Sequence, residues 1–325
     1  MIREFISKIP VPVCGLSLGL ASLDRFFWYY YGDIYTFNIF ALFAFIIAAM
    51  FTIRLIIDIK GVIKDVQTPA VFGVVPTYTM TLMLLAAYAK DHVGGIVGDV
   101  ALVIWLSAIA ASFVLMVIFI RKAFFSFSMD RVFPSWVIIF VGYVVASVTS
   151  PSFGMENLGR IIFWSGFFGY LFIIPVIAYR TVRIRMPESL VPQIAIITAP
   201  ANLCVVGCMA AYGNDPTGAT AVAFTIVAVM GLISYAAVMA YMPVLLNRRF
   251  YPSFAALTFP LVISATAFYK LGEYYGVSSG IYDIILKIMI AAAILIVVYV
   301  LIRYTMYFYK TAKEAHSSAK SQKIG

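Results

Sequence analysis

The chain is a succession of long apolar segments separated by short polar connections. Each apolar segment is close to the length of about 20 residues that a helix needs to cross a bilayer, and none alternates apolar and polar residues as a barrel strand would. Short connections favour antiparallel pairing of consecutive helices. The pattern therefore predicts an all-α polytopic membrane protein with ten transmembrane helices arranged as five helical hairpins. The predicted spans are residues 10–30, 35–59, 69–89, 96–120, 133–149, 158–179, 190–212, 219–246, 253–269 and 281–307.

The composition agrees with this pattern. Of the 325 residues, 63% are hydrophobic and 11% are charged, whereas a soluble domain carries about 25% charged residues. The formal net charge of +9 would by itself be compatible with a nucleic-acid partner. The positions of the basic residues favour a different explanation, because they lie in alternate connections and at both ends of the chain, as they do in the cytoplasmic loops of membrane proteins.

Basic and acidic residues alternate from one connection to the next. The basic set, which includes both ends of the chain, comprises Arg3, Lys8, Lys60, Lys64, Arg121, Lys122, Arg131, Arg180, Arg183, Arg185, Arg248, Arg249 and, in the tail of residues 310–325, Lys310, Lys313, Lys320 and Lys323. The other set of connections is acidic or nearly neutral and contains Asp33, Asp91, Asp99, Glu156, Asp215 and Glu273. The positive-inside rule predicts that both termini are cytoplasmic and that the protein is integral to the inner or plasma membrane of the cell. Anionic lipid is a sufficient partner for the basic loops, and no nucleic acid is expected.

A proline recurs near the cytoplasmic start of every odd-numbered span. These residues are Pro12, Pro76, Pro134, Pro200 and Pro260, at intervals of 64, 58, 66 and 60 residues. Each interval matches one hairpin with its two connections, which indicates an internal repeat of one supersecondary unit. Because proline removes a backbone hydrogen bond and bends a helix, we predict a quasi-five-fold ring in which kinked, odd-numbered helices line a central pore.

The odd-numbered spans are also richer in small and hydroxyl-bearing residues, whereas the even-numbered spans are rich in Ile, Leu, Val and Phe. Large apolar side chains suit helices that face lipid, so the even-numbered helices are predicted to form an outer ring. Small residues suit either the lining of a pore or close helix packing, as in the Gly15-xxx-Gly19 pair of the first span. Both interpretations place the odd-numbered helices inside.

The sequence Thr258-Phe259-Pro260 places a large, rigid ring beside a proline in the ninth span. A helix break in a membrane is tolerated where neighbours or a cavity satisfy the freed carbonyl. One interpretation is a ring that stands in a pathway, because a hydrophobic constriction can gate a pore by excluding water. The other interpretation is ordinary packing. Under the first, Phe259 is the candidate gate.

Ionisable side chains are missing from the interiors of the third, fifth, seventh and ninth spans, and the first span has only Asp24 and Arg25, which we expect to compensate each other. Proton-coupled carriers need titratable groups at depth, so the sequence favours a path lined by methyl groups, hydroxyls and aromatic rings. Helix N-terminal dipoles and hydroxyl donors would give such a path a weak preference for anions. Cys204 and Cys208 have no His or carboxylate in their span, so no metal is expected. No motif of an enzyme or of a cofactor site is present, so neither an enzymatic activity nor a cofactor is predicted.

Three stretches, residues 9–21, 199–201 and 257–269, together with the five-hairpin repeat, resemble the tellurite-resistance/dicarboxylate transporter family. This family includes the bacterial TehA-type channels and the plant guard-cell slow anion channels. The resemblance implies a homotrimer with a pore in each protomer, occluded by a phenylalanine on the ninth helix that corresponds to Phe259. It also implies a small glycine on the first helix, corresponding to Gly15, where a side chain would intrude on the pore. Phe268 lies further along the ninth span and is the weaker candidate for the gate.

We therefore predict an anion channel that passes small monovalent anions such as chloride and nitrate. Phe259 is its predicted gate, and Gly15 and the five repeated prolines are its predicted pore-lining or kink residues. The alternative is a secondary transporter or exporter of C4-dicarboxylates such as malate, of sulfite or of tellurite, with or without proton coupling. A carrier would show saturable exchange coupled to a gradient, whereas a channel would show unitary currents.

Overall fold

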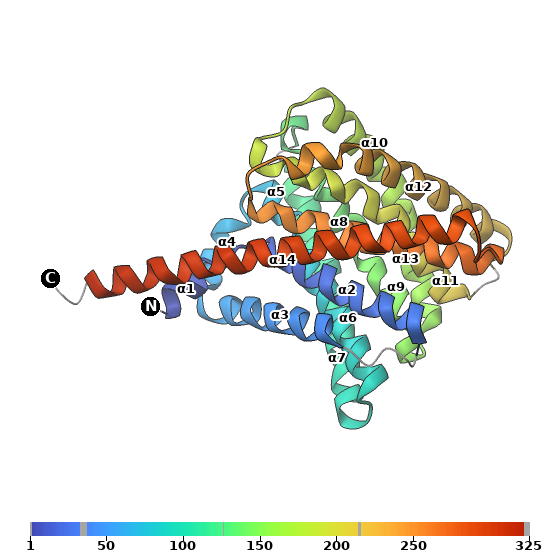
Figure 1. Cartoon of the computed structure of the whole chain (residues 1–325), viewed down its shortest axis with the longest axis horizontal. Coiled ribbons are helices and arrows are strands. Elements are labelled where there is room, and N and C mark those ends of the chain that lie inside the picture. The colour runs from blue at the N-terminus through green and yellow to red at the C-terminus, as the bar shows by residue number, and fades with distance from the viewer. Residues whose placement is uncertain (1, 33–37, 126, 214–215, 322–325) are drawn as a thin grey trace.

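The protein, described from a computed structural model, is helical throughout residues 2–32, 38–125, 127–213 and 216–321, where α-helices and short 3-10 helices are joined by turns and no strand is found (Figure 1). The prediction of an all-α protein is confirmed. Some positions named in the sequence predictions lie outside these described residues, namely Asp33, residues 35–37, Asp215 and residues 322–325.

The elements follow one another along the chain with these bounds. They are α1 (Ile2–Ser7), α2 (Val13–Tyr31), α3 (Ile39–Ile57), α4 (Ile59–Asp65), α5 (Pro69–Phe72), α6 (Pro76–His92), α7 (Gly95–Phe125), η2 (Met129–Arg131), α8 (Trp136–Val141), η3 (Gly142–Val144), α9 (Val145–Thr149), η4 (Ser150–Phe153), α10 (Glu156–Arg183), η5 (Glu188–Thr198), α11 (Ala199–Tyr212), α12 (Gly218–Leu246), η6 (Pro252–Leu257), α13 (Thr258–Tyr275) and α14 (Ile281–Ser321), where η marks a 3-10 helix.

By length and composition, nine helical stretches in the described part of the chain are long and apolar enough to cross a membrane. They correspond to the second to tenth predicted spans. The first predicted span corresponds to α2, which is not among them because Asp24, Arg25, Trp28 and the tyrosines at positions 29–31 lower its mean hydropathy. Residues 13–24 of α2 are buried inside the protein. That α2 forms a tenth span stays a prediction.

The helices fall into a buried set and an exposed set. In the third, fifth, seventh and ninth spans, 72–83% of the residues are buried in the protein. In α3, α7, α10, α12 and α14, which form the even-numbered spans, the share is 28–44%. The exposed residues of the second set are large and apolar, such as Phe45, Ile233 and Leu295. A surface of this composition is suited to lipid. The sequence prediction that the odd-numbered spans lie inside is therefore confirmed.

The buried helices close a ring. α2 contacts α6, α6 contacts α9, α9 contacts α11, α11 contacts α13, and α13 returns to α2. Each exposed helix packs against the ring helix of its own hairpin, as α3 does on α2, α7 on α6 and α14 on α13. The hairpin arrangement of the prediction is thus present, while the quasi-five-fold symmetry of the ring stays a prediction.

The repeated prolines mark helix starts rather than bends at mid-helix, and here the structure differs from the predicted kinks. Pro76 and Pro200 lie in the first turns of α6 and α11, Pro12 directly precedes α2, and Pro260 is in the first turn of α13. Pro134 lies two residues before α8. The first N–H groups of an α-helix have no partner within the helix, so proline loses nothing there. A 3-10 helix, a short helix or a turn precedes each of these helices. The short element and the helix that follows it together make one span with a break.

Both ends of the described chain lie at one end of the bundle. α1 and the last turns of α14 are at the left in Figure 1, and α2 runs from there towards the right. We call the left side the terminal end and the opposite side the distal end. The basic tail predicted for residues 310–325 continues α14 as far as Ser321.

Candidate functional site

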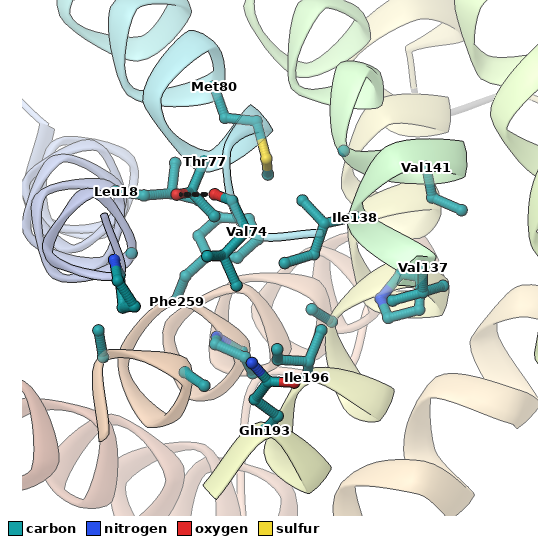
Figure 2. Close-up of a pocket in the computed structure, with 18 of the residues that line it drawn as sticks. Leu18, Val74, Thr77, Met80, Val137, Ile138, Val141, Gln193, Ile196 and Phe259 are labelled. Atoms are coloured by element: carbon teal, nitrogen blue, oxygen red, sulfur yellow. Dashed lines mark hydrogen bonds between the residues drawn. The ribbon is translucent and has the colours of Figure 1, made fainter. Parts of the chain in front are cut away.

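A cavity lies inside the ring near the terminal end, and we call it the proximal cavity. It is lined by the start of α2, by the first turns of α6, α11 and α13, and by α8, η5 and η6, so each of the five inner spans contributes (Figure 2). Its volume is about 50 Å³. A water molecule needs about 10 to 15 Å³ on this scale, so the cavity has room for a few water molecules.

The lining of the proximal cavity is almost entirely apolar. Figure 2 shows Val74, Met80, Ile138, Ile196 and Phe259 around its centre. The polar lining side chains are Thr77, Gln193 and Ser253, and none of the described lining residues is ionisable. This agrees with the sequence prediction of a path lined by methyl groups and aromatic rings.

Phe259 borders the proximal cavity and also a second, much smaller one. Its side chain is 6% exposed and lines both the proximal cavity and a cavity of about 10 Å³, which we call the narrow cavity. Leu203 of α11 also lines both. The sequence analysis missed Leu203, because one leucine in an apolar helix carries no signal that distinguishes it.

A third cavity, the distal vestibule, follows the narrow cavity towards the distal end. Its volume is about 310 Å³. It shares Arg25, Tyr29 and Val206 with the narrow cavity. The three cavities are therefore linked in series through common lining residues, first Phe259 and Leu203, then Arg25 and its neighbours.

Arg25 does not pair with Asp24, and the predicted mutual compensation of these two charges is wrong. The guanidinium of Arg25 lies 2.5 Å from Oδ2 of Asp91 on α6, and it also donates to Ser152 Oγ at 3.0 Å and to the Tyr29 hydroxyl at 3.0 Å. Adjacent residues on a helix point in different directions, so neighbours in sequence do not face each other. A fixed cation thus lines the series of cavities, which the sequence analysis did not expect.

Asp24 instead accepts a hydrogen bond from the neighbouring helix α3. Its side chain is 3% exposed, and its Oδ1 accepts a hydrogen bond from the backbone N–H of Ala41 at 3.2 Å. Ala41 lies in the first turn of α3, where N–H groups lack partners within the helix and negative charge is stabilising. Asp24 is therefore a structural link between α2 and α3.

The predicted pore residues are only partly brought together. Phe259, Gly15, Pro12, Pro200 and Pro260 line the proximal cavity. Pro76 and Pro134 are not among its described lining residues, which at these two helix starts include Val74, Thr77, Val137 and Ile138. Successive side chains of a helix differ in direction by about 100°. At these two helix starts the proline therefore points away from the cavity, whereas the residues near it point into the cavity.

The two glycines of α2 differ in what they contact. A Cβ on Gly15 would lie 3.3 Å from Cβ of Ala255 in η6, which is tight but tolerable. A Cβ on Gly19 would lie 2.5 Å from Cβ and Oγ1 of Thr258 and 3.0 Å from the backbone N of Phe259. Gly19, which the sequence analysis treated only as packing, is thus the glycine that touches the backbone of the candidate gate.

Several buried hydroxyls of the ring donate hydrogen bonds to backbone carbonyls of neighbouring elements, as Thr258 illustrates. Its Oγ1 donates to Gly15 O at 2.9 Å and to Ala255 O at 2.8 Å, and it ties the start of α13 to α2. Ser17 Oγ similarly reaches Ala44 O at 2.7 Å. A buried hydroxyl needs a hydrogen-bond partner, and these carbonyls on adjacent helices provide it.

Thr258→Val is expected to lower the stability of the protein by about 1 to 2 kcal/mol, since it removes the buried donor to Gly15 O while keeping the shape of the side chain. The change is measured as a lower apparent Tm of the purified protein in detergent. Thr266→Val is the matched control, because the Thr266 hydroxyl donates to Val262 O of its own helix at 2.9 Å. Equal Tm values for the two variants would contradict a special role for the Thr258 bond.

Comparison with known families agrees with this architecture. The sequence model of the voltage-dependent anion channel family matches residues 9–305. The chain belongs to this family. As a member of the voltage-dependent anion channel family with membrane-crossing helices, it is an integral membrane protein of anion transport. The family resemblance of the sequence motifs is thereby confirmed. A search among curated proteins finds no significant match.

Proposed function

We propose that this protein is an anion channel for small monovalent anions such as chloride and nitrate, and that Phe259 closes it. One observation carries the proposal: the Phe259 side chain lines the proximal cavity on one side and the narrow cavity on the other. A buried aromatic ring between two cavities is a hydrophobic constriction, and such a constriction closes a pore by excluding water.

The preference for anions is supported by the helix starts. The first turns of α6, α11 and α13 contribute Thr77, Pro200 and Phe259 to the lining of the proximal cavity. A helix N-terminus carries a partial positive charge of about half an elementary charge, which stabilises a nearby anion. At the other end of the path, Arg25 and Lys270 line the distal vestibule.

The same lining supports a small monovalent anion over a dicarboxylate. A C4-dicarboxylate would bring two charges into the proximal cavity, whose described lining has no cationic side chain. Desolvating a second charge without a partner is costly. Transport of malate, sulfite or tellurite, with or without proton coupling, is the alternative that the experiment below separates.

The family resemblance of the sequence motifs extends the proposal to assembly, and the pattern of basic loops extends it to location. We place the protein in the inner or plasma membrane as a homotrimer with one pore in each protomer. Both termini are cytoplasmic, because the basic loops belong to the terminal end. The terminal end then faces the cytoplasm and the distal vestibule opens on the outside.

The test is a current measurement on the purified protein in planar bilayers. Wild type and Phe259→Ala are compared in a gradient of potassium chloride and then of potassium nitrate. A channel gives unitary currents that reverse near the anion equilibrium potential and grow with driving force. Saturable exchange of labelled malate, driven by a pH gradient and without unitary currents in either protein, would overturn the channel and favour the carrier.

A further inference from the structure

The distal vestibule is lined by ionisable side chains, and one of them, Arg25, also lines the narrow cavity. The described residues that line the vestibule include the cations Arg25 and Lys270 and one carboxylate, Asp91. Each of these cations has a carboxylate partner, since Lys270 Nζ lies 2.6 Å from Oε2 of Glu273 and the Arg25 guanidinium lies 2.5 Å from Oδ2 of Asp91. Arg25 therefore lines this cavity of about 310 Å³ as one half of an ion pair. A cation in a partly enclosed cleft attracts anions, and its partner carboxylate competes with them for it.

Arg25 is held at this position by three elements of the ring. α2 supplies Arg25 and Tyr29, α6 supplies Asp91, and η4 supplies Ser152, whose hydroxyl also donates to Asp91 Oδ2 at 2.9 Å. A guanidinium has five N–H donors, and these three partners use three of them. Among the described residues, no further hydrogen-bond partner of Arg25 is found, so donors remain for a ligand in the cavities that it lines.

The Arg25–Asp91 contact also stands between two cavities. Arg25 lines both the narrow cavity and the distal vestibule, whereas Asp91 lines only the vestibule. The Arg25 side chain is 10% exposed. An ion that passes from the vestibule into the narrow cavity must therefore pass the guanidinium, on the side where Asp91 neutralises it.

We propose that the distal vestibule is a binding site for monovalent anions, in which the anion replaces Asp91 on the guanidinium of Arg25. The Arg25–Asp91 pair is then a second barrier, in series with Phe259, that only an anion can open. Lys270 lines the same vestibule, with its Nζ paired with Glu273 at 2.6 Å and 4.8 Å from the centre of the Tyr29 ring. The role of the pair as a barrier rests on the proposed channel function, whereas the binding of an anion does not.

Iodide binding tests the site directly, because iodide quenches tryptophan fluorescence and Trp28 lies beside Arg25. The Arg25 Cζ is 5.0 Å from the centre of the Trp28 ring, and Trp28 lines the vestibule. The purified protein is titrated with sodium iodide at constant ionic strength, and Trp28→Phe identifies the part of the signal that belongs to Trp28.

Wild type is expected to show a saturable component of quenching. Asp91→Asn keeps the shape of the side chain and removes its charge, so the iodide concentration at half-saturation should fall by about fivefold or more, since one charge about 4 Å away is worth about 1 kcal/mol even in water. Arg25→Gln should remove the saturable component, and Lys270→Met should weaken it. Identical curves for wild type, Asp91→Asn and Lys270→Met would overturn the site, even if Arg25→Gln does not fold.

Asp99→Asn is the matched control, because Asp99 is an exposed carboxylate on α7 near the same end of the bundle and is not among the described lining residues of the three cavities. It makes the same change in net charge and should titrate as wild type. A shift equal to that of Asp91→Asn would indicate a general surface-charge effect and would overturn the specific site.

Currents then test the barrier. In a Phe259→Ala background, adding Asp91→Asn should raise the current carried by anions that enter from the distal end, whereas adding Asp99→Asn should not. Equal currents with and without Asp91→Asn would overturn the barrier. If Phe259→Ala itself carried no anion current, the proposed channel function would fail, and the iodide titrations would still decide the binding site.

Discussion

Replacing Phe259 with alanine is expected to raise the anion current at a fixed voltage by about tenfold or more, which corresponds to removing about 1.4 kcal/mol or more of the barrier to permeation. The physical reason is the position of the ring between the proximal cavity of about 50 Å³ and the narrow cavity of about 10 Å³. Removing the ring joins the two volumes and permits a continuous file of water. The measurement is the mean current in planar bilayers, normalised to the amount of reconstituted protein.

The controls for this prediction are two other residues of the inner helices. Phe268→Ala removes an identical side chain from α13, but Phe268 stacks on Tyr282 with ring centres 4.1 Å apart and is not among the described lining residues of the three cavities. Its current should equal that of wild type. Leu203→Ala should raise the current by less than Phe259→Ala does, because Leu203, like Phe259, lines both the proximal and the narrow cavity.

A folded Phe259→Ala protein with the wild-type current would contradict the gate. Folding is checked by the size-exclusion profile and the apparent Tm. A lower Tm is expected, because truncation of a buried Phe costs about 3 to 5 kcal/mol in tightly packed cores. The cost here should be at the lower end, since the ring already borders two cavities.

Gly19→Ala is expected to be the more damaging of the two glycine-to-alanine substitutions in α2. The new Cβ would lie 2.5 Å from Cβ of Thr258 and 3.0 Å from the backbone N of Phe259, so α13 must move away from α2. Overpacking of this kind costs about 1 to 3 kcal/mol, and the movement also weakens the Thr258 bond to Gly15 O. The expected result is a lower apparent Tm, together with a raised basal anion current, because the backbone that holds the gate is displaced.

Gly15→Ala is the matched control, one helical turn earlier on the same face of α2. Its Cβ would be 3.3 Å from Cβ of Ala255, a distance that a shift of a few tenths of an ångström relieves. The loss of stability and the change in current should both be smaller than for Gly19→Ala. If Gly15→Ala were the more disruptive of the two, the contact between Gly19 and Thr258 would not be what positions Phe259.

Much of the architecture follows from the sequence, because a bilayer restricts the options so strongly. A spanning segment must satisfy its own backbone, which makes long apolar runs helical. The contrast between small residues and large apolar residues then separates the inner from the outer helices, since lipid and a packed interior select different side chains. The exposed Phe45 and Leu295 and the fully buried Ala267 and Val13 agree with that separation.

Local geometry was harder to predict from the sequence. The repeated prolines indicate a broken backbone in each odd-numbered span, but not whether the break is a bend or a helix start. In the structure, 3-10 segments such as η5 and η6 precede the starts of α11 and α13. The sequence does not separate the two, because proline occurs both at bends inside membrane helices and in the first turn of a helix, where no backbone hydrogen bond is lost.

The sequence by itself therefore determined the fold class, the inner and outer helices, and the apolar character of the path around Phe259. Only the tertiary structure decided which side chains meet: Arg25 with Asp91 instead of Asp24, Leu203 beside Phe259, and Gly19 against Thr258. The physical reason is that hydropathy and helix propensity act along one segment. Contacts between ring helices, in contrast, depend on their rotation and axial position, which are set by all the neighbours packed together.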